Sequence, residues 1–283
     1  MDLIESLTEA GMHFRASILD RYKLNSIFIE AQPAAEVDLG LAKSRIGGCP
    51  DAPKNFKWPR HRGKPLSFIA QFNLQALLEH DKDHRLPGEG MLSFFCAGDD
   101  VSGHDNDDKG GFKAYHFKEP ILSLERKVAP EKAFALPPSK LKFSSEYCYP
   151  IRGNLESCGL DDAVEERYDN DSDPDNPFEY LDILSKCASN RKNIRLLGYP
   201  DLIQGGIFES CQMGANGIID KPYSDPKHKK MLEGRKDWTL LFQLDLNGSI
   251  PGWGASVVLY FAIKKKDLAK GDFDEVWLVK DCR

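Results

Sequence analysis

The sequence of 283 residues has no run of about 18 apolar residues, which is the length that a membrane-spanning helix needs. It also lacks the basic start and apolar stretch of a signal peptide, because Asp2, Glu5 and Glu9 stand near its beginning. We therefore expect neither a membrane segment nor an export signal, and we predict a cytoplasmic protein.

Positive charge is not in excess, since the net charge is −6. Nucleic-acid-binding proteins usually carry a basic patch, so we predict no nucleic-acid partner. The seven cysteines are an odd number, and none is spaced as Cys-x-x-Cys. This pattern favours reduced thiols over a disulfide framework or a zinc site.

Familiar catalytic patterns are missing as well. There is no Gly-x-Ser-x-Gly motif, and the glycines of 204–217 lack the spacing and the lysine of a phosphate-binding loop. Cys49, in a Gly-rich loop near His61, is the best candidate nucleophile, although a loop thiol without a partner is the simpler interpretation. We assign no catalytic residue, metal or cofactor, and the question of enzymatic activity stays open.

One stretch follows part of the calcium-loop pattern. Asp105, Asp107 and Gly110 stand at the first, third and sixth positions. The twelfth position is His116, where a bidentate glutamate belongs. A turn rich in Asp and Gly between two strands is the simpler interpretation.

The apolar pattern predicts many strands and few long helices. We expect strands at 26–31, 66–73, 91–97, 112–118, 121–127, 140–148, 238–246, 256–263 and 274–281. We expect helices at 2–22, 74–80 and 264–270 and in two pieces over 159–188, with loops at 43–65, 195–206 and 221–236. The elements do not alternate regularly, which predicts a β-dominated α+β fold with mostly antiparallel sheets and a few peripheral helices.

Three features occur twice in the same order, which indicates an internal duplication. They are a Gly-x-Pro-Asp turn (48–51 and 198–201), an apolar strand containing glutamine ("LSFIAQFNL", 66–74, and "WTLLFQLDL", 238–246) and a second strand (90–95 and 256–261). We predict a single domain over 1–283 with an N-terminal helix (1–24), two halves (about 25–150 and 193–283) and a helical, acidic insertion (about 151–192).

The repeated glutamines, Gln71 and Gln243, lie on the strand face opposite to the apolar one, because side chains alternate along a strand. One interpretation is structural: each amide bonds to a covering loop, such as a Gly-x-Pro-Asp turn. The other is a polar groove between the halves that binds a ligand. The groove would be lined by Arg45, Gln71, Asn73, Gln204, Gln243 and Asp245.

The segments "SRIGGCPDAP", "LSFIAQFNL", "LPGEGMLSFF", "LLGYPDLIQG", "WTLLFQLDL" and "DFDEVWLVKDC" stand in this order along the chain. Together they resemble the YwqG-like family, a bacterial domain of unknown function, over about residues 25–283. The resemblance implies one compact, β-dominated domain and no established catalytic residue. Genes of this family are often found near secreted-toxin systems, so the resemblance implies a role in immunity.

These observations favour a non-enzymatic module that binds a protein, and specifically an immunity protein that neutralises a cognate toxin. An acidic inhibitor would suit a basic toxin through electrostatic steering. The expected contact residues are Asp99, Asp100, Asp105, Asp107, Asp108, Asp169, Asp171, Asp173 and Asp175. The alternative is a small-molecule-binding protein, or an uncharacterised enzyme, that uses the groove between the halves.

Overall fold

The computed structural model describes residues 2–98, 101–130, 133, 135–150, 152–155, 158, 162–171, 179–188, 194–203, 205–218, 226–246 and 257–282. The strands are β1 (Leu24–Pro33), β2 (Arg45–Ile46), β3 (Asp51–Ala52), β4 (Arg60–His61), β5 (Lys64–Pro65), β6 (Ser67–Asn73), β7 (Met91–Cys96), β8 (Phe112–Phe117), β9 (Glu125–Arg126), β10 (Ser139–Cys148), β11 (Ile194–Leu196), β12 (Trp238–Leu246), β13 (Val257–Lys264) and β14 (Trp277–Cys282). The α-helices are α1 (Leu3–Glu9), α2 (His13–Arg21), α3 (Arg152–Leu155), α4 (Asp162–Asp169), α5 (Glu179–Ala188), α6 (Ile207–Ala215), α7 (Pro226–Leu232) and α8 (Lys265–Leu268). The described 3₁₀ helices are η1 (Glu36–Asp38), η2 (Leu74–Leu77), η3 (Asn106–Asp108), η4 (Ile121–Ser123) and η6 (Glu233–Asp237).

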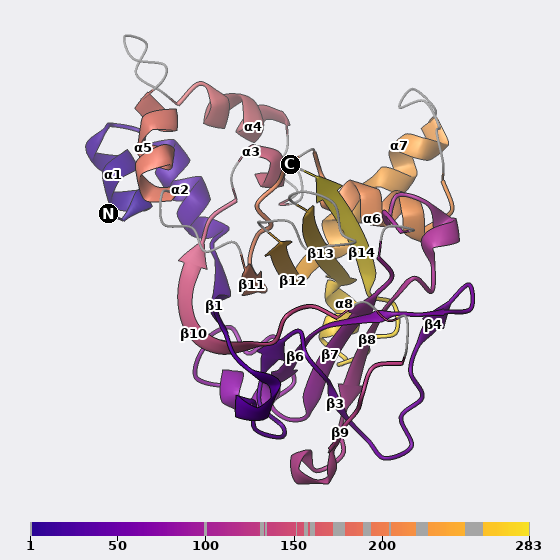
Figure 1. The fold of residues 1–283 in the computed structure, drawn as a ribbon. Coiled ribbons are helices and arrows are strands. Elements are labelled where there is room, and N and C mark those ends of the chain that lie inside the picture. Colours follow the sequence, from indigo (N-terminus) through magenta and orange to yellow (C-terminus); the bar gives the residue numbers. More distant parts are fainter. Residues whose placement is uncertain are drawn as a thin grey trace.

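One large antiparallel sheet dominates the fold (Figure 1). Its ten strands follow the order β14-β13-β12-β11-β1-β10-β2-β6-β7-β8. Two short pairs, β3 with β9 and β4 with β5, lie outside it. The predicted β-dominated α+β class with mostly antiparallel strands is therefore confirmed.

The sheet is built from two similar arms. The strand that precedes each arm along the chain pairs with the other arm, so the arms exchange their first strands. Strands β2, β6, β7 and β8 form one arm, and β11, β12, β13 and β14 form the other. In chain order β1 precedes the first arm, yet it pairs with β11 of the second. Strand β10 precedes the second arm and pairs with β2 of the first. Because β1 and β10 also pair with each other along their full length, the two halves are interlocked.

Bulges occur at matching places in the two arms. The β6–β7 register shifts between Phe68 and Ala70, and the β12–β13 register shifts between Leu240 and Phe242. A bulge changes which side chains share a face. Strict alternation along 66–74 predicts that Leu66, Phe68, Ala70, Phe72 and Leu74 share one face. That prediction is wrong, because Leu66 and Phe68 join a separate cluster with Phe95, whereas Ala70, Phe72 and Leu74 lie in the main core.

The main core lies where the inner faces of the two arms meet. The rings of Phe72 and Phe242 have centroids 5.0 Å apart, and those of Phe94 and Phe261 lie 4.9 Å apart. All four side chains are fully buried. Burial of aromatic surface is the largest favourable contribution that such strands can make to stability.

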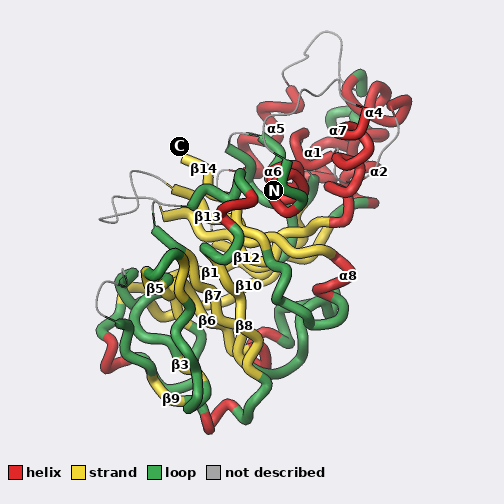
Figure 2. The backbone as a smooth tube through the Cα atoms, turned by 90° about the vertical axis from the view of Figure 1, so that its right-hand side faces the viewer, coloured by secondary structure: helices red, strands yellow, loops and turns green. Residues whose placement is uncertain are grey.

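The helical insertion packs against the N-terminal helices to form a lobe with its own small core. Figures 1 and 2 show α1, α2, α4 and α5 together at one end of the molecule, opposite β3 and β9. The predicted single helix over 2–22 is two helices, because Gly11 breaks it in a left-handed conformation with φ 79°. Arg15 joins the lobe by donating to the carbonyl oxygens of Tyr168 and Asp169.

Two further helices, α6 and α7, occupy stretches where the sequence predicted loop or no element. Helix α6 contacts β12, β13 and β14 and covers part of the second arm. Among the described residues, no helix is both long enough and apolar enough to cross a membrane.

Candidate functional site

The repeated glutamines hold the two Gly-x-Pro-Asp loops against the sheet. The Gln71 Oε1 accepts a hydrogen bond of 2.7 Å from the backbone N–H of Asp51. In the other half, the Gln243 Oε1 accepts one of 2.9 Å from the backbone N–H of Asp201. Both glutamines are buried, with 0% and 1% of their surface exposed. The structural interpretation of the two glutamines is confirmed.

An arginine completes each loop clamp. Arg45 pairs with Gln71 across the β2–β6 ladder, and Arg195 pairs with Gln243 across the β11–β12 ladder. The Arg45 Nη2 lies 3.3 Å from the Asp51 carboxylate, and Arg195 forms an ion pair with Asp201. Burial lowers the pKa of Arg45, and the Asp51 charge opposes that effect. Each clamp therefore balances a buried positive charge with the loop aspartate.

Two of the other predicted groove residues, Asn73 and Asp245, are also at least half-buried in the fold. The Asn73 Nδ2 donates to the Ala42 carbonyl oxygen over 3.1 Å, and its Oδ1 accepts from the N–H of Gln75 at the start of η2. Asp245 is buried on β12, with 7% of its surface exposed. Gln204 lies outside the described residues. The structure brings Arg45 and Gln71 together, but none of the five described groove residues lines either of the two cavities described below.

The predicted acidic contact residues divide into exposed and structural ones. Asp107 and Asp169 are exposed, whereas Asp105 is half-buried and caps η3. Asp108 is buried and accepts from the backbone N–H groups of Ser102 and Gly103, so its carboxylate is used by its own loop. The Asp171 carboxylate accepts from the Arg15 N–H over 2.5 Å. Asp99, Asp100, Asp173 and Asp175 lie outside the described residues.

Cys49, the candidate nucleophile, is not activated by its surroundings. All seven are free thiols. Burial, followed by the nearby Glu36 carboxylate, raises the pKa of Cys49, which disfavours the reactive thiolate. Among the described side chains, no three His, Cys, Asp or Glu residues are grouped so that they could hold a metal ion.

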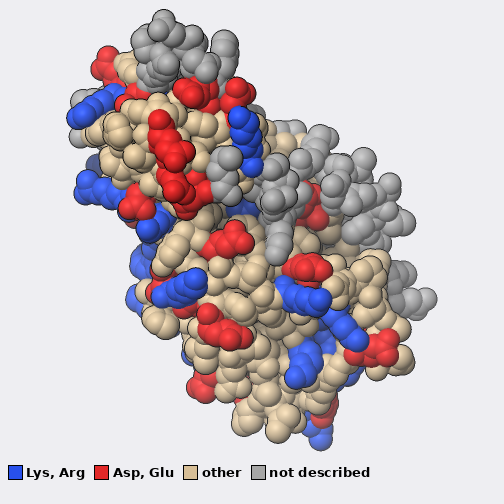
Figure 3. All heavy atoms as spheres, turned by 90° about the vertical axis from the view of Figure 1, so that its left-hand side faces the viewer, with Lys and Arg blue, Asp and Glu red and all other residues tan. Residues whose placement is uncertain are grey.

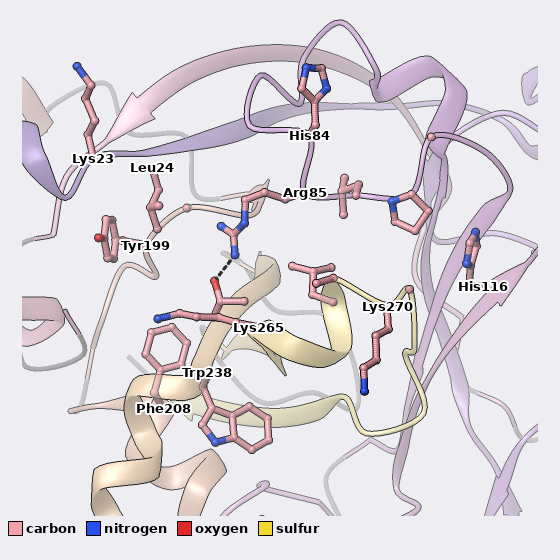
Figure 4. Close-up of a pocket in the computed structure, with 18 of the residues that line it drawn as sticks. Lys23, Leu24, His84, Arg85, His116, Tyr199, Phe208, Trp238, Lys265 and Lys270 are labelled. Carbon is pink, nitrogen blue, oxygen red and sulfur yellow. Dashed lines mark hydrogen bonds between the residues drawn. The ribbon is translucent and has the colours of Figure 1, made fainter. Parts of the chain in front are cut away.

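A cavity of about 1010 Å³ lies between the two halves (Figure 4). The first half contributes the loop 84–89 and the end of β8, and the second half contributes the start of β12 and residues 265–271. The segment from α2 to β1 closes a further side. A second cavity of about 340 Å³ lies beside the Asp201 loop.

Basic side chains outnumber acidic ones in the wall of the larger cavity. Its Lys, Arg and His residues are Arg21, Lys23, His84, Arg85, His116, Lys118, Lys265 and Lys270. Glu89 is the single acidic residue among the described ones that line it. Apolar side chains, including Leu24, Phe208 and Leu268, complete the wall. No local motif could reveal this site, because its residues come from separate segments of both halves.

Arg85 occupies the middle of this wall. Figure 4 shows its guanidinium directed from the 84–89 loop toward Thr239 on β12. The Arg85 Nη2 donates to the Thr239 Oγ1 over 2.9 Å. Burial lowers the pKa of Arg85, and the charges of Asp81 and Asp83 oppose that effect.

Comparison with protein families shows a match over residues 44–282 to DUF1963, described as a domain of unknown function. The match covers most of the chain, so the protein belongs to this family. No curated protein matches the sequence.

Proposed function

We propose that this member of a family of unknown function is a binding protein for a small molecule, which it holds in the cavity between its halves. The observation that carries the proposal is the cavity of about 1010 Å³ itself. Ligand sites usually measure roughly 300–1,000 Å³ and combine apolar walls with a few polar groups. Both the volume and the mixed lining of this cavity fit that description.

The position of the cavity supports the same proposal. Its wall joins residues 84–89 of the first half to Trp238 and Thr239 of the second. Ligand sites commonly lie at such junctions, where two rigid units present side chains to one space. The ligand site that we propose is therefore between the halves, as the sequence suggested, but away from the glutamine clamps.

A thermal-shift screen tests the proposal. Small molecules of anionic, neutral and cationic classes should include at least one that raises the melting temperature, because a ligand bound only to the folded state stabilises it. Ala269→Trp adds bulk at the cavity wall and should abolish that shift, whereas Ala35→Trp, also at an exposed alanine but outside the cavity, should preserve it. A shift that survives Ala269→Trp unchanged would place the binding site elsewhere.

A second candidate function is protein recognition through acidic residues, with an immunity protein that neutralises a toxin as the specific form. It is supported by the exposure of Asp107 and Asp169. Figure 3 shows acidic side chains, with some basic ones among them, over the upper part of the face that it draws. Rim charges act mainly on association rates. Asp107→Asn combined with Asp169→Asn should therefore slow association with a basic partner recovered by affinity capture.

We also propose that, within its family, the chain is YwqG-like. The segments that resemble the YwqG-like family, in the same order along the chain, support this proposal, and the family match is compatible with it. A cytoplasmic location is supported by the seven free thiols, because disulfides are common in oxidising compartments.

A further inference from the structure

We infer that the ligand of this cavity is an anion, such as a phosphorylated or sulfonated organic molecule, and that Arg85 supplies its counter-charge. This inference rests on the proposed function, because it specifies the ligand class of the same cavity.

Arg85 differs from Arg45, Arg126 and Arg195 in having no carboxylate within ion-pair distance among the described residues. Arg45, Arg126 and Arg195 each form an ion pair with an aspartate of a clamp loop. Arg15 instead places its guanidinium against two backbone carbonyl oxygens. Among the described residues, Arg85 has the Thr239 hydroxyl as its partner, and its buried Nη1 has none.

The two acidic residues whose charges act on Arg85 each use one carboxylate oxygen on the backbone. The Asp81 Oδ2 accepts from the N–H of Leu86 over 2.7 Å, and the Asp83 Oδ2 accepts from the N–H of Asn25 over 2.9 Å. Neither carboxylate lies within ion-pair distance of Arg85 in the described part of the chain. These two aspartates shape the loop that presents Arg85 and leave its charge directed toward the cavity.

A half-buried charge without an ion-pair partner is costly, because burial removes water that the single Thr239 hydroxyl replaces only in part. Lys265 and Lys270 stand on the opposite wall (Figure 4). Glu89, the acidic residue of this wall, is exposed. An anion would reduce the repulsion between Arg85 and the two lysines and would pair with the planar guanidinium, which suits phosphate and carboxylate oxygens.

The apolar part of the wall indicates what the anionic group is attached to. Phe208 and Leu268 are buried side chains whose remaining surface faces the same space. Burial of an organic moiety against them would add a hydrophobic contribution that free phosphate cannot make. The structure thus favours an organic anion over an inorganic one.

Three probes of matched shape and different charge test the inference: 1-naphthyl phosphate, 1-naphthol and 1-naphthylmethylamine. Isothermal titration calorimetry on the full chain should show the phosphate binding at least roughly tenfold more tightly than the neutral probe, since a charge-assisted bond contributes about that much. The cationic probe should bind most weakly. Among the three probes, only 1-naphthyl phosphate should bind more weakly when salt is added.

Variants assign the preference to named residues. Arg85→Met should reduce the affinity for 1-naphthyl phosphate roughly tenfold or more and leave that for 1-naphthol nearly unchanged. Arg60→Met, at an exposed arginine outside the cavity, should change neither affinity. Lys270→Met removes an exposed lysine of the wall, so this variant should fold even if Arg85→Met does not. Lys270→Met should reduce the affinity for 1-naphthyl phosphate by roughly twofold to fivefold.

The outcomes separate the inference from the proposed function. Equal binding of the phosphate and the neutral probe, unaffected by Arg85→Met and Lys270→Met, would leave a small-molecule site and overturn the preference for anions. Binding of none of the three probes, together with no hit in the thermal-shift screen, would overturn both. Tighter binding of free phosphate than of 1-naphthyl phosphate would overturn the organic part of the assignment.

Discussion

Phe94 and Phe261 hold equivalent positions in the two arms of the sheet, and their ring centroids lie 4.9 Å apart. The equivalence follows from the registers, since Phe94 faces Ala70 one residue before Gln71, and Phe261 faces Phe242 one residue before Gln243. The duplicated halves therefore contact each other through corresponding side chains. The centre of the core is a junction of two copies of one structural unit.

This junction can be tested with a double-mutant cycle. Phe94→Ala and Phe261→Ala should each reduce the free energy of unfolding by about 3–5 kcal/mol, because each leaves a cavity in the core. The double variant should cost less than the sum by about 0.5–1.5 kcal/mol, which is the aromatic pair term. Urea denaturation at equilibrium measures all three values, and strict additivity would show that the rings are not coupled.

The glutamine clamps should be important for stability. Gln71→Ala and Gln243→Ala each leave the buried N–H of a loop aspartate without an acceptor, so each should lower the free energy of unfolding by about 1–3 kcal/mol. Gln75→Ala, at an exposed glutamine close by, should have almost no effect. Unchanged stability in both clamp variants, with ligand binding lost, would instead favour a polar groove.

The first clamp loop also depends on glycine at position 47. Gly47 has φ 65°, and a Cβ there would lie 2.4 Å from the carbonyl oxygens of Leu136 and Pro137. Gly47→Ala should therefore destabilise the protein by roughly 3 kcal/mol or more. Gly63 has φ 79° with no atom within 4 Å of a Cβ, so Gly63→Ala should show only the backbone strain of about 1–2 kcal/mol. Thermal melts should show a larger drop in melting temperature for Gly47→Ala than for Gly63→Ala.

Stability should fall at alkaline pH in part because of Cys211. Burial raises the pKa of this thiol well above its ordinary value. A raised folded-state pKa gives stability that is fully present below the unfolded thiol's pKa of about 8.5 and is lost as the pH rises. Between pH 9 and 10.5 the wild type should lose up to roughly 1.4 kcal/mol per pH unit more than Cys211→Ala does. Parallel stability curves for the two proteins would contradict this expectation.

The sequence predicted the strands well because alternation and β-branched or aromatic residues mark them. The strand expected at 238–246 coincides with β12, and the one expected at 140–148 is β10 with one more residue. Helix α6 was missed because Gly214 within it and the glycines on either side of it are typical of loops. Gly214 serves close packing instead, since a Cβ there would lie 2.6 Å from the Trp277 ring.

The exchange of β1 and β10 and the cavity could not be predicted from local patterns. Alternation shows that 26–31 forms a strand but carries no information on which distant strand it joins. The cavity depends on that arrangement, because it brings residues 84–89 beside Trp238 and Lys265. The clamps could be predicted because the Gly-x-Pro-Asp turn and the glutamine occur in the same order in each half of the sequence.

The exchange of first strands has a consequence for synthesis on the ribosome. Strand β1 is made early, but its partners are β10 and β11, whose residues end at Cys148 and Leu196. One edge of β1 therefore stays unpaired until about half of the chain has been translated, and the other until about two thirds has. Unpaired strand edges are prone to association. Nascent chains stalled before residue 148 should be sensitive to proteolysis within β1, and completion of the second half should protect both halves together.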